Sequence, residues 1–298
     1  MRVAITGSSG LIGSALADAL QRDGNEVTRL VRRSPRRSGE IPWNPLASDG
    51  GLDPAVFDGI DAVVHLSGAP VAGGLWTKAR KLTLRASRIQ STKALVAALA
   101  GAASPPTALL SGSAVGWYGD TGAREVDESA PAGAGFLADL VRDWEAAAQP
   151  ATQAGLRVVS LRSGVVLSHH GGMLGPLVPL FRFGLGARLG PGTQFISWIS
   201  ITDHVAAVRY LLEHPDIDGP VNLTAPVPVT NAEFTTELAR ALRRPALLRI
   251  PAPVLRAGLG EMSGELLGSQ RVVPHRLLEA GFAFQYPRVA SALAAELT

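Results

Sequence analysis

The feature that most constrains this chain is a glycine-rich run at residues 6–13, TGSSGLIG, close to its first residue. An apolar stretch, Arg2–Thr6, precedes the run and an amphipathic stretch, Leu11–Arg22, follows it, so the glycines join a predicted strand to a predicted helix. In such a turn the first glycine permits a tight reversal, the second lets the backbone approach a pyrophosphate, and the third lets the helix pack closely. The free N–H groups and the dipole of the helix start favour an anion there. The predicted contacts are Gly7, Ser9, Gly10, Leu11, Ile12 and Gly13. The alternative is a glycine-rich turn with a purely structural role.

Short apolar runs rich in Val, Ile and Leu alternate with longer amphipathic stretches. This alternation predicts an α/β fold of the Rossmann type, a doubly wound parallel sheet with helices on both faces. The predicted strands are residues 2–6, 26–31, 62–66, 107–110 and 157–161. The predicted helices are residues 11–22, 76–99 and 136–153.

Closely spaced glycines after about residue 163 indicate a loop-rich second lobe. A further strand at 221–224 and a helix at 232–242 with Asn231 as its N-cap are expected there, followed by helices from Pro251 to the aromatic segment 281–287. We expect residues 1–165 to form the cofactor-binding domain, to which 198–225 return. Residues 166–298 then form a smaller C-terminal lobe.

The second predicted strand ends at Val31, where many NAD-binding sites place an acidic residue on the ribose diol. This chain has Arg32 and Arg33 there instead. Guanidinium groups bind a 2′-phosphate through charge-assisted hydrogen bonds, whereas a carboxylate would repel it. The sequence therefore predicts NADP(H) as the cofactor.

Composition narrows the class of protein. The net charge is only +3, from 28 Lys and Arg against 25 Asp and Glu, so the arginine-rich run at 32–37 does not indicate a nucleic-acid binder. The absence of cysteine excludes disulfides and thiolate nucleophiles. No apolar run is long enough for a membrane span and the N-terminus lacks a signal peptide, so we expect a cytoplasmic protein without membrane contacts.

The motifs together resemble the extended short-chain dehydrogenase/reductase superfamily. The resemblance is strongest to its atypical sugar-nucleotide epimerase-like branch, the NAD-dependent epimerase/dehydratase family, with the C-terminal domain of unknown function found in cell-division-inhibitor-like proteins. It covers nearly the whole chain. Beyond the glycine run it rests on residues 61–68, 87–89, 113–119, 136–145, 161–167, 197–201 with Asp203, 260–262, 270–274 and 279–282.

The resemblance implies further cofactor contacts. Leu66, Ser67 and Gly68 should line the adenosine side with backbone atoms. Arg88 matches the family's cofactor-proximal arginine, the alternative being a solvated helix arginine. Val165 matches the place where relatives cover the nicotinamide.

The catalytic residues depart from the family's pattern. Its usual Tyr-x-x-x-Lys pair is absent: the tyrosines are Tyr118, Tyr210 and Tyr286, and the residues four positions later are Gly122, His214 and Ala290. Phe136 and Leu140 occupy the corresponding helix. There remain Ser113, at the position of the hydroxyl that orients a substrate, and Tyr118. Tyr118 is either a proton donor or a packed aromatic; without a nearby cation, a phenol of pKa about 10 is a poor base.

The other polar candidates have structural alternatives. Asp203 either positions substrate or caps a helix beginning at Val205, and capping is the preferred interpretation. His65 lies within an apolar strand and is expected to be a hydrogen-bonded core residue. His169 and His170 have no carboxylate at ligand spacing, so we expect no metal site.

The sequence predicts an NADP(H)-dependent oxidoreductase that acts on an unknown polar small molecule, more a reductase than a true epimerase, because reduction needs no strong base. The alternative is a sensor or scaffold that binds NADP(H) without turnover and regulates a protein partner. A homodimer is compatible with either.

Overall fold

The computed structural model describes residues 1–47, 51–72 and 74–297, which form two compact units interleaved along the chain. The first unit comprises Met1–Ser113, Asp139–Leu161 and Val205–Val221, and the second comprises Ala114–Ala138, Arg162–His204 and Asn222–Thr298. The sequence placed a boundary near residue 165 and a return of residues 198–225 to the first domain. In the structure Val205–Val221 belong to the first unit, and the chain also passes through the second unit earlier, at Ala114–Ala138.

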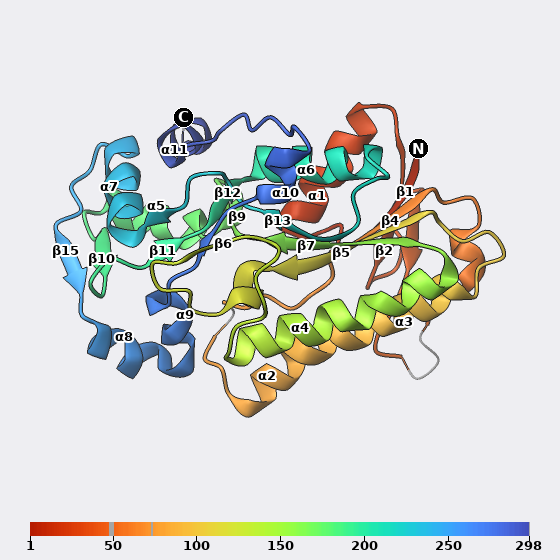
Figure 1. The fold of residues 1–298 in the computed structure, drawn as a ribbon, viewed down its shortest axis with the longest axis horizontal. Coiled ribbons are helices and arrows are strands. Elements are labelled where there is room, and N and C mark those ends of the chain that lie inside the picture. Colours follow the sequence, from red (N-terminus) through yellow and green to blue (C-terminus); the bar gives the residue numbers. More distant parts are fainter. Residues whose placement is uncertain (48–50, 73, 298) are drawn as a thin grey trace. The chain divides into compact units, whose positions relative to one another are not determined.

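The main sheet has seven strands in the order β13-β7-β5-β4-β1-β2-β3 (Figure 1). They are β1 Arg2–Thr6, β2 Glu26–Val31, β3 Glu40–Pro42, β4 Ala62–His65, β5 Ala108–Ala114, β7 Arg157–Ser163 and β13 Gly219–Leu223. β1 pairs in parallel with both β2 and β4, and β4 pairs in parallel with β5. The strand order therefore reverses between β1 and β4, the position at which doubly wound sheets bind ligands beyond the carboxyl ends of their strands. The predicted α/β Rossmann fold is confirmed.

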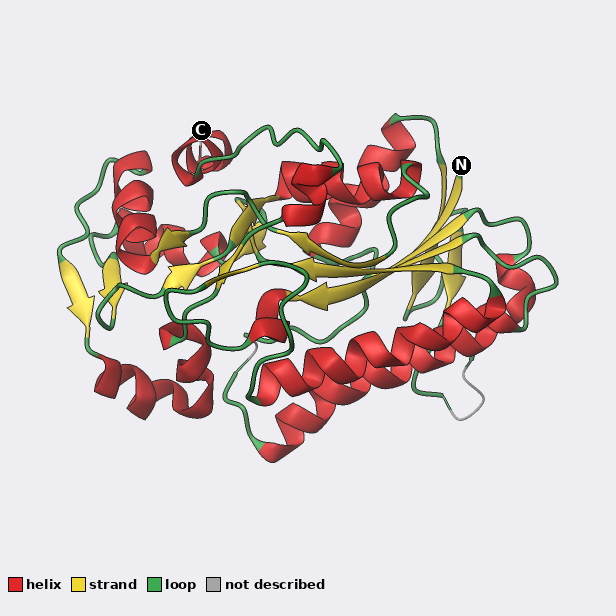
Figure 2. Ribbon diagram, viewed as in Figure 1, coloured by secondary structure: helices red, strands yellow, loops and turns green. Residues whose placement is uncertain are grey.

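Figure 2 shows helices on both faces of this sheet: α1 and α6 on one face, and α2, α3 and α4 on the other. Their bounds are α1 Leu11–Arg22, α2 Lys78–Arg85, α3 Ser91–Ala100, α4 Phe136–Ala148 and α6 Ile201–Glu213. Short turns of other helical types are η1 Pro54–Phe57, η2 Ala86–Gln90 and η4 Gln149–Ala154. The predicted helix 76–99 is thus divided by a π-helical turn, η2, into α2 and α3.

The core of the first unit lies between the sheet and these helices. Ala4, Val63 and Leu109 project from the central strands and are fully buried, as are Leu95 and Leu99 of α3. Burial of a leucine side chain stabilises the fold by roughly 1.5–3 kcal/mol. The apolar strand runs seen in the sequence are therefore buried because helices cover both faces of the sheet.

The second unit is built from short elements. Its strands are β6 Glu125–Val126, β8 Val165–Ser168, β9 Gly171–Gly172, β10 Ala187–Leu189, β11 Phe195–Ile196, β12 Trp198–Ser200, β14 Val229–Thr230, β15 Leu248–Ile250 and β16 Arg271–Val272. Its helices are α5 Leu174–Arg182, α7 Asn231–Ala241, α8 Ala252–Leu259, α9 Ser263–Leu267, α10 His275–Glu279 and α11 Val289–Leu297, with η3 Val115–Tyr118 and η5 Gly260–Met262. The fully buried Trp198 and Leu167 belong to its main apolar cluster.

Two predicted helix starts are wrong, by one residue for α7 and by four residues for α6. α7 is capped by Thr230, not by Asn231: the Thr230 hydroxyl accepts from Glu233 N, and the Glu233 carboxylate accepts from Thr230 N. α6 begins at Ile201 rather than Val205, because Ser200 Oγ accepts from Asp203 N at 2.9 Å. α11 also lies beyond the aromatic segment 281–287, at which the last predicted helix ends.

No helix within the described residues combines the length and apolar character that crossing a membrane requires.

Candidate functional site

The glycine-rich turn between β1 and α1 is shaped by close backbone approaches. Gly7 has φ of +68°, and a Cβ atom on it would lie 2.6 Å from Leu66 O. A Cβ on Gly13 would lie 2.3 Å from Gly7 O, so the first turn of α1 packs directly on the loop. At Gly10 the nearest atom to such a Cβ is Gly7 O at 3.3 Å, so this position faces the more open side of the loop.

The start of α1 is suited to an anion. Gly10 is the N-cap, and among the described residues no side chain caps it. Leu11 and Ile12 form the first turn, whose backbone N–H groups have no partner within the helix. Uncapped N–H groups together with the helix dipole fit a phosphate of the predicted dinucleotide.

Arg32 and Arg33, which follow β2, have different surroundings. The Arg33 guanidinium forms two 2.8 Å hydrogen bonds with the carboxylate of Glu40, and Arg37 Nε and Arg36 N also donate to Glu40. These contacts, the Arg33 hydrogen bond above all, hold the pKa of Glu40 well below its usual range. Arg32 is exposed and has no ion-pair or hydrogen-bond partner within the described part of the chain. Arg32 is therefore the arginine available to a 2′-phosphate.

The turn after β4 lies against the π-helical turn η2. Ala69 N donates to Ser87 Oγ, and Arg88 Nη1 donates to Ala69 O, both at 3.0 Å. A Cβ on Gly68 would lie 3.1 Å from the Arg88 guanidinium carbon, which also lies 5.1 Å from the centre of the Trp144 ring. Burial, and then the charge of Arg80, lowers the pKa of Arg88 to about 10. Arg88 is thus a partly buried residue beside the predicted Leu66–Gly68 contact, and not a solvated helix arginine.

Beneath this edge of the sheet, a buried polar chain links β1 to α4. The Thr6 hydroxyl is 2.7 Å from His65 Nδ1, and His65 Nε2 is 3.0 Å from the Thr92 hydroxyl. Trp144 Nε1 donates to the same Thr92 hydroxyl at 3.0 Å. Burial lowers the pKa of His65 to about 3, so the ring is neutral at physiological pH. The prediction that His65 is a hydrogen-bonded core residue is confirmed.

Ser113, near the carboxyl end of β5, has a partner that the sequence reading did not identify. Its hydroxyl donates to Glu145 Oε1 of α4 at 2.5 Å, and the two residues are only 5% and 8% exposed. Glu145 lies on the same helix face as the buried Val141 and Ala148. An acidic residue within this apolar stripe was the available sequence signal, because a buried carboxylate requires a partner.

Tyr118 belongs to the second unit, and its hydroxyl is engaged on both sides. It donates to Asn222 Oδ1 at 2.7 Å and accepts from Arg162 Nη1 at 3.0 Å. A cation is therefore present, contrary to the expectation from sequence. Burial nevertheless dominates and raises the pKa of Tyr118 to about 12. These contacts favour the packed-aromatic interpretation over a proton donor.

Val165, the residue expected to cover the nicotinamide, is half-buried at the start of β8 in the second unit. Its N–H donates to Ser197 O at 2.8 Å, and it stands opposite Trp198 of β12 in the sheet register. The neighbouring Gly164 approaches Ser197 O so closely that a Cβ would lie 2.6 Å from it. The backbone at this position is therefore well defined.

Asp203 does not cap a helix at Val205, so that expectation is wrong. Its carboxylate accepts from Gln285 N at 2.7 Å, from Tyr286 N at 3.0 Å and from the Ser200 hydroxyl. The fully buried Asp203 carboxylate thus fixes the backbone of the segment that leads to α11.

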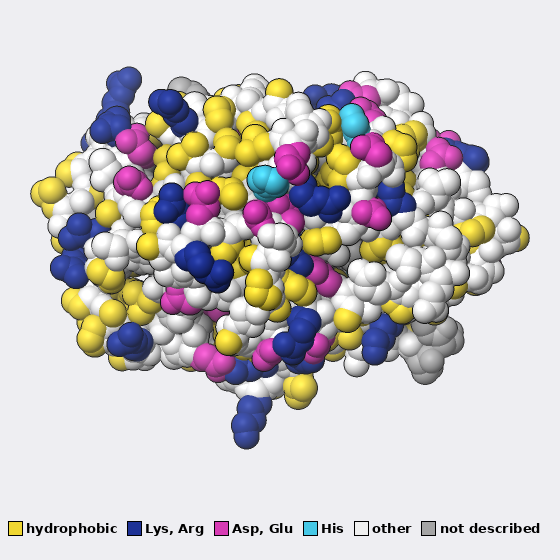
Figure 3. All heavy atoms as spheres, viewed as in Figure 1, with side chains coloured by type: hydrophobic (Ala, Val, Ile, Leu, Met, Phe, Trp, Pro, Cys, Tyr) yellow, Lys and Arg dark blue, Asp and Glu magenta, His cyan; other side chains and the backbone are white. Residues whose placement is uncertain are grey.

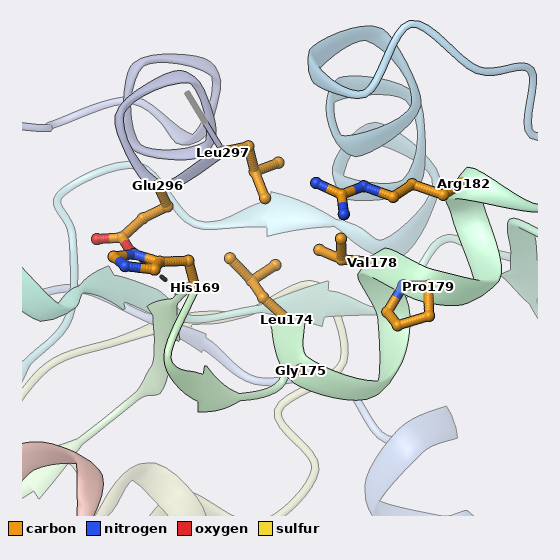
Figure 4. Close-up of a pocket in the computed structure, with 8 residues that line it drawn as sticks. All are labelled: His169, Leu174, Gly175, Val178, Pro179, Arg182, Glu296 and Leu297. Atoms are coloured by element: carbon orange, nitrogen blue, oxygen red, sulfur yellow. Dashed lines mark hydrogen bonds and ion pairs between the residues drawn. The ribbon is translucent and has the colours of Figure 1, made fainter.

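A cavity of about 400 Å³ in the second unit is lined by residues of α5 and α11 together with His169. Figure 4 shows the side chains that line it. His169 Nδ1 lies 3.0 Å from Glu296 Oε2 on one side, Arg182 lies on the other, and Leu174 and Val178 line the floor. Two donors do not make a metal site, and no group of three or more His, Asp or Glu in the described ranges could hold a metal ion.

Figure 3 shows basic and acidic side chains interspersed over one face of the molecule.

Comparison with known proteins identifies the chain's relatives. The NAD dependent epimerase/dehydratase family matches residues 3–223, and a domain of unknown function, DUF1731, matches residues 250–296. The chain belongs to the NAD-dependent epimerase/dehydratase family. An epimerase family protein of Mycobacterium tuberculosis is 51% identical over 98% of this chain and 96% of its own length.

Relatives in animals are more distant but equally complete. The mouse epimerase family protein SDR39U1 is 38% identical over 98% of both chains. A crystal structure of human SDR39U1 (isoform 2) with NADPH has a TM-score of 0.91 and 34% identity, covering 100% of this chain and 99% of that one. The resemblance noted in the sequence, including the C-terminal domain, is confirmed.

Proposed function

We propose that this family member is an NADP(H)-dependent oxidoreductase that reduces an unknown polar small molecule. The observation that carries the proposal is the glycine loop of the first unit, where an uncapped α1 begins at the switch point and Arg32 lies free at the end of β2. The NADPH in the human SDR39U1 crystal structure supports the same cofactor for this chain.

The side chains and backbone present fit a dinucleotide. The loop 7–13 would hold the pyrophosphate, Arg32 the 2′-phosphate, and residues 66–68 the adenosine, with Arg88 fixing that turn from behind. When bound, the nicotinamide supplies hydride transfer, which is the cofactor's own chemistry. The protein's remaining tasks are to orient a substrate oxygen and to exchange a proton with it. Ser113 is the hydroxyl proposed for that contact.

Calorimetric titration with NADPH and NADH tests the cofactor assignment. We expect tight binding of NADPH and weaker binding of NADH. Gly10→Val should abolish binding of both, because its side chain would occupy the open side of the loop where the pyrophosphate enters. Circular dichroism confirms that the variant is folded. Unchanged NADPH affinity in folded Gly10→Val would overturn the phosphate-loop assignment.

The second candidate is a sensor or scaffold that binds NADP(H) without turnover. The observation that favours it is the occupation of the usual Tyr and Lys positions by Phe136 and Leu140, which cannot move a proton. Oxidation of NADPH in the presence of carbonyl compounds separates the two candidates. Tight NADPH binding without any such turnover would favour the sensor.

A further inference from the structure

The family's usual proton-transfer pair is missing, but α4 carries another titratable group at the relevant edge of the sheet. The Ser113 hydroxyl donates to Glu145 Oε1 at 2.5 Å, and both side chains are buried. O–H···O⁻ hydrogen bonds of this length are charge-assisted and strong. The bond therefore fixes the orientation of the Ser113 hydroxyl, with its proton toward Glu145 and its lone pairs directed elsewhere.

The pair lies at the edge of the first unit where the cofactor contacts are expected. β4 and β5 are in parallel register with His65 opposite Ser111. Ser113 is therefore two residues beyond that pair on β5, and Ser67 is two residues beyond it in the turn that follows β4. A Cβ on Gly112 would lie 3.1 Å from His65 O and 2.9 Å from the Trp144 ring. β5 therefore packs tightly on both its neighbour strand and α4, and Glu145 follows Trp144 directly.

Two other buried residues with ionisable protons, His65 of the first unit and Tyr118 of the second, are already held by hydrogen bonds. His65 is hydrogen-bonded on both ring nitrogens, and its pKa is about 3. Tyr118 is hydrogen-bonded to Asn222 and Arg162, and its pKa is about 12. Neither exchanges a proton readily near neutral pH, whereas a serine–carboxylate pair exchanges one along a hydrogen bond that already exists.

We propose that Glu145 is the positioning residue of the active site and acts through Ser113 as its proton relay, taking the place of the absent Tyr-x-x-x-Lys pair. This inference rests on the proposed oxidoreductase function. For reduction, a proton from solvent first binds the Glu145 carboxylate, which then donates to Ser113 Oγ and frees the Ser113 proton to face the substrate. The Ser113 O–H bond breaks as this proton moves to the substrate oxygen, and an O–H bond re-forms at Ser113 with the proton from the Glu145 carboxyl group, which leaves the carboxylate seen in the structure. The carbonyl carbon gains the two electrons with the hydride that NADPH supplies, and oxidation of an alcohol reverses each step.

The first test compares variants in NADPH oxidation with diacetyl, nitrobenzaldehyde and phenanthrenequinone as carbonyl probes. Glu145→Gln keeps an acceptor for Ser113 but holds no exchangeable acid proton. We expect kcat to fall about 10²–10⁴-fold, the range of general acid–base catalysis, with NADPH affinity unchanged. Asp139→Asn, on an exposed position of the same helix, is the matched control and should leave kcat unchanged.

Coupling between the two residues separates a relay from a structural role. The double variant Ser113→Ala/Glu145→Gln should be no slower than Ser113→Ala alone, because both residues act in one step. Glu145→Asp should recover part of the lost rate, and Glu145→Gln should flatten the pH profile of kcat. If Glu145→Gln does not fold, Glu145→Asp must still lower kcat at unchanged NADPH affinity. Additive losses, or an unchanged pH profile in Glu145→Gln, would overturn the relay.

The second test needs no turnover. Isotope-edited infrared difference spectra of wild type against Glu145→Gln isolate the carboxyl bands of Glu145. These bands should shift in Ser113→Ala, because the hydroxyl that donates to Glu145 Oε1 is removed. Carboxyl bands of Glu145 that do not shift in Ser113→Ala would overturn the inference.

The outcomes also distinguish this inference from the proposed function. Turnover by the wild type with an unaffected Glu145→Gln variant overturns the relay alone. Wild-type protein that binds NADPH and reduces none of the probes overturns the oxidoreductase function, and the relay with it.

Discussion

Arg32 and Arg33 are adjacent in sequence, yet Glu40 makes them inequivalent. Glu40 is buried and accepts two of the hydrogen bonds of the Arg33 guanidinium, which also donates to Ser34 O. Replacing Arg33 therefore removes loop contacts, whereas replacing Arg32 removes a free charge. Arg32→Ala should weaken NADPH binding by about 1.5–3 kcal/mol, the scale of hydrogen bonds to charged groups, and leave NADH binding nearly unchanged. Calorimetry with both cofactors measures this difference. Equal losses for the two would remove the 2′-phosphate assignment.

The glycines of the loop should also respond differently to alanine. A Cβ at Gly13 would lie 2.3 Å from Gly7 O, and backbone atoms cannot move aside cheaply. Gly13→Ala should therefore lower the free energy of unfolding by about 1–3 kcal/mol, the usual cost of overpacking. Gly10→Ala, whose Cβ would lie 3.3 Å from that oxygen, is the control and should lose much less stability. Urea unfolding followed by circular dichroism compares the two, and similar midpoints would contradict the packing argument.

At the scale of elements, Asp203 shows how one side chain orders a distant segment. It accepts the backbone N–H groups of Gln285 and Tyr286, which precede α11. Asp203→Ala would leave both donors unpaired, at a cost of about 1–3 kcal/mol each if they stay buried. We expect hydrogen exchange at residues 285–297 to accelerate, while exchange in β1 and β4 stays slow. Uniform acceleration throughout the chain would indicate global destabilisation instead.

Elements determined by local pattern could be predicted and those determined by distant partners could not. β1, α1 and β2 have the predicted bounds, because alternation of apolar runs and a glycine turn specify them locally. The start of α6 was predicted wrongly because both Ser200 and Asp203 can cap a helix. In the structure Ser200 is the residue that accepts a backbone N–H at this end of the helix, whereas the Asp203 carboxylate accepts from Gln285 N of a distant segment. Nothing local in the run 86–90 indicates the π turn η2.

The candidate site likewise has one part that the local sequence predicts and contacts that depend on distant residues. The phosphate loop follows from spacing alone, since glycine is required wherever backbone atoms approach closely. The binding of Arg33 by Glu40 and of Ser113 by Glu145 depends on residues 7 and 32 positions away that only the folded sheet brings together. Ser113 and the arginines are therefore recognisable in the sequence, whereas their partners are not.

For the whole molecule, buried histidines predict a loss of stability in mild acid. The pKa values of His65 and His204 fall from 6.5 to about 3 and about 4 because burial disfavours the charged ring. Below about pH 6.5 the unfolded chain therefore binds protons that the folded chain does not. Each histidine should lower the free energy of unfolding by about 1.4 kcal/mol per pH unit as the pH falls toward its folded value.

Urea unfolding at pH 7 and pH 5 measures this loss, and His65→Asn provides the comparison. The variant should be less stable at pH 7, because it disturbs the Thr6 and Thr92 contacts, yet its stability should fall less between the two pH values. Parallel pH dependence in variant and wild type would show that His65 is not the source.

The enclosure of Glu40 has a consequence for the speed of cofactor capture. The Glu40 carboxylate cancels one of the four arginine charges at residues 32–37, so the field that extends into solvent is weaker than the arginines alone would produce. Long-range attraction of an anion raises its encounter rate steeply at low ionic strength, and salt screens that attraction beyond about 10 Å at 0.1 M. We therefore expect the association rate of NADPH to fall less steeply with salt than four uncompensated arginines would make it fall, and the contact of Arg32 with the 2′-phosphate to appear in how slowly the cofactor dissociates.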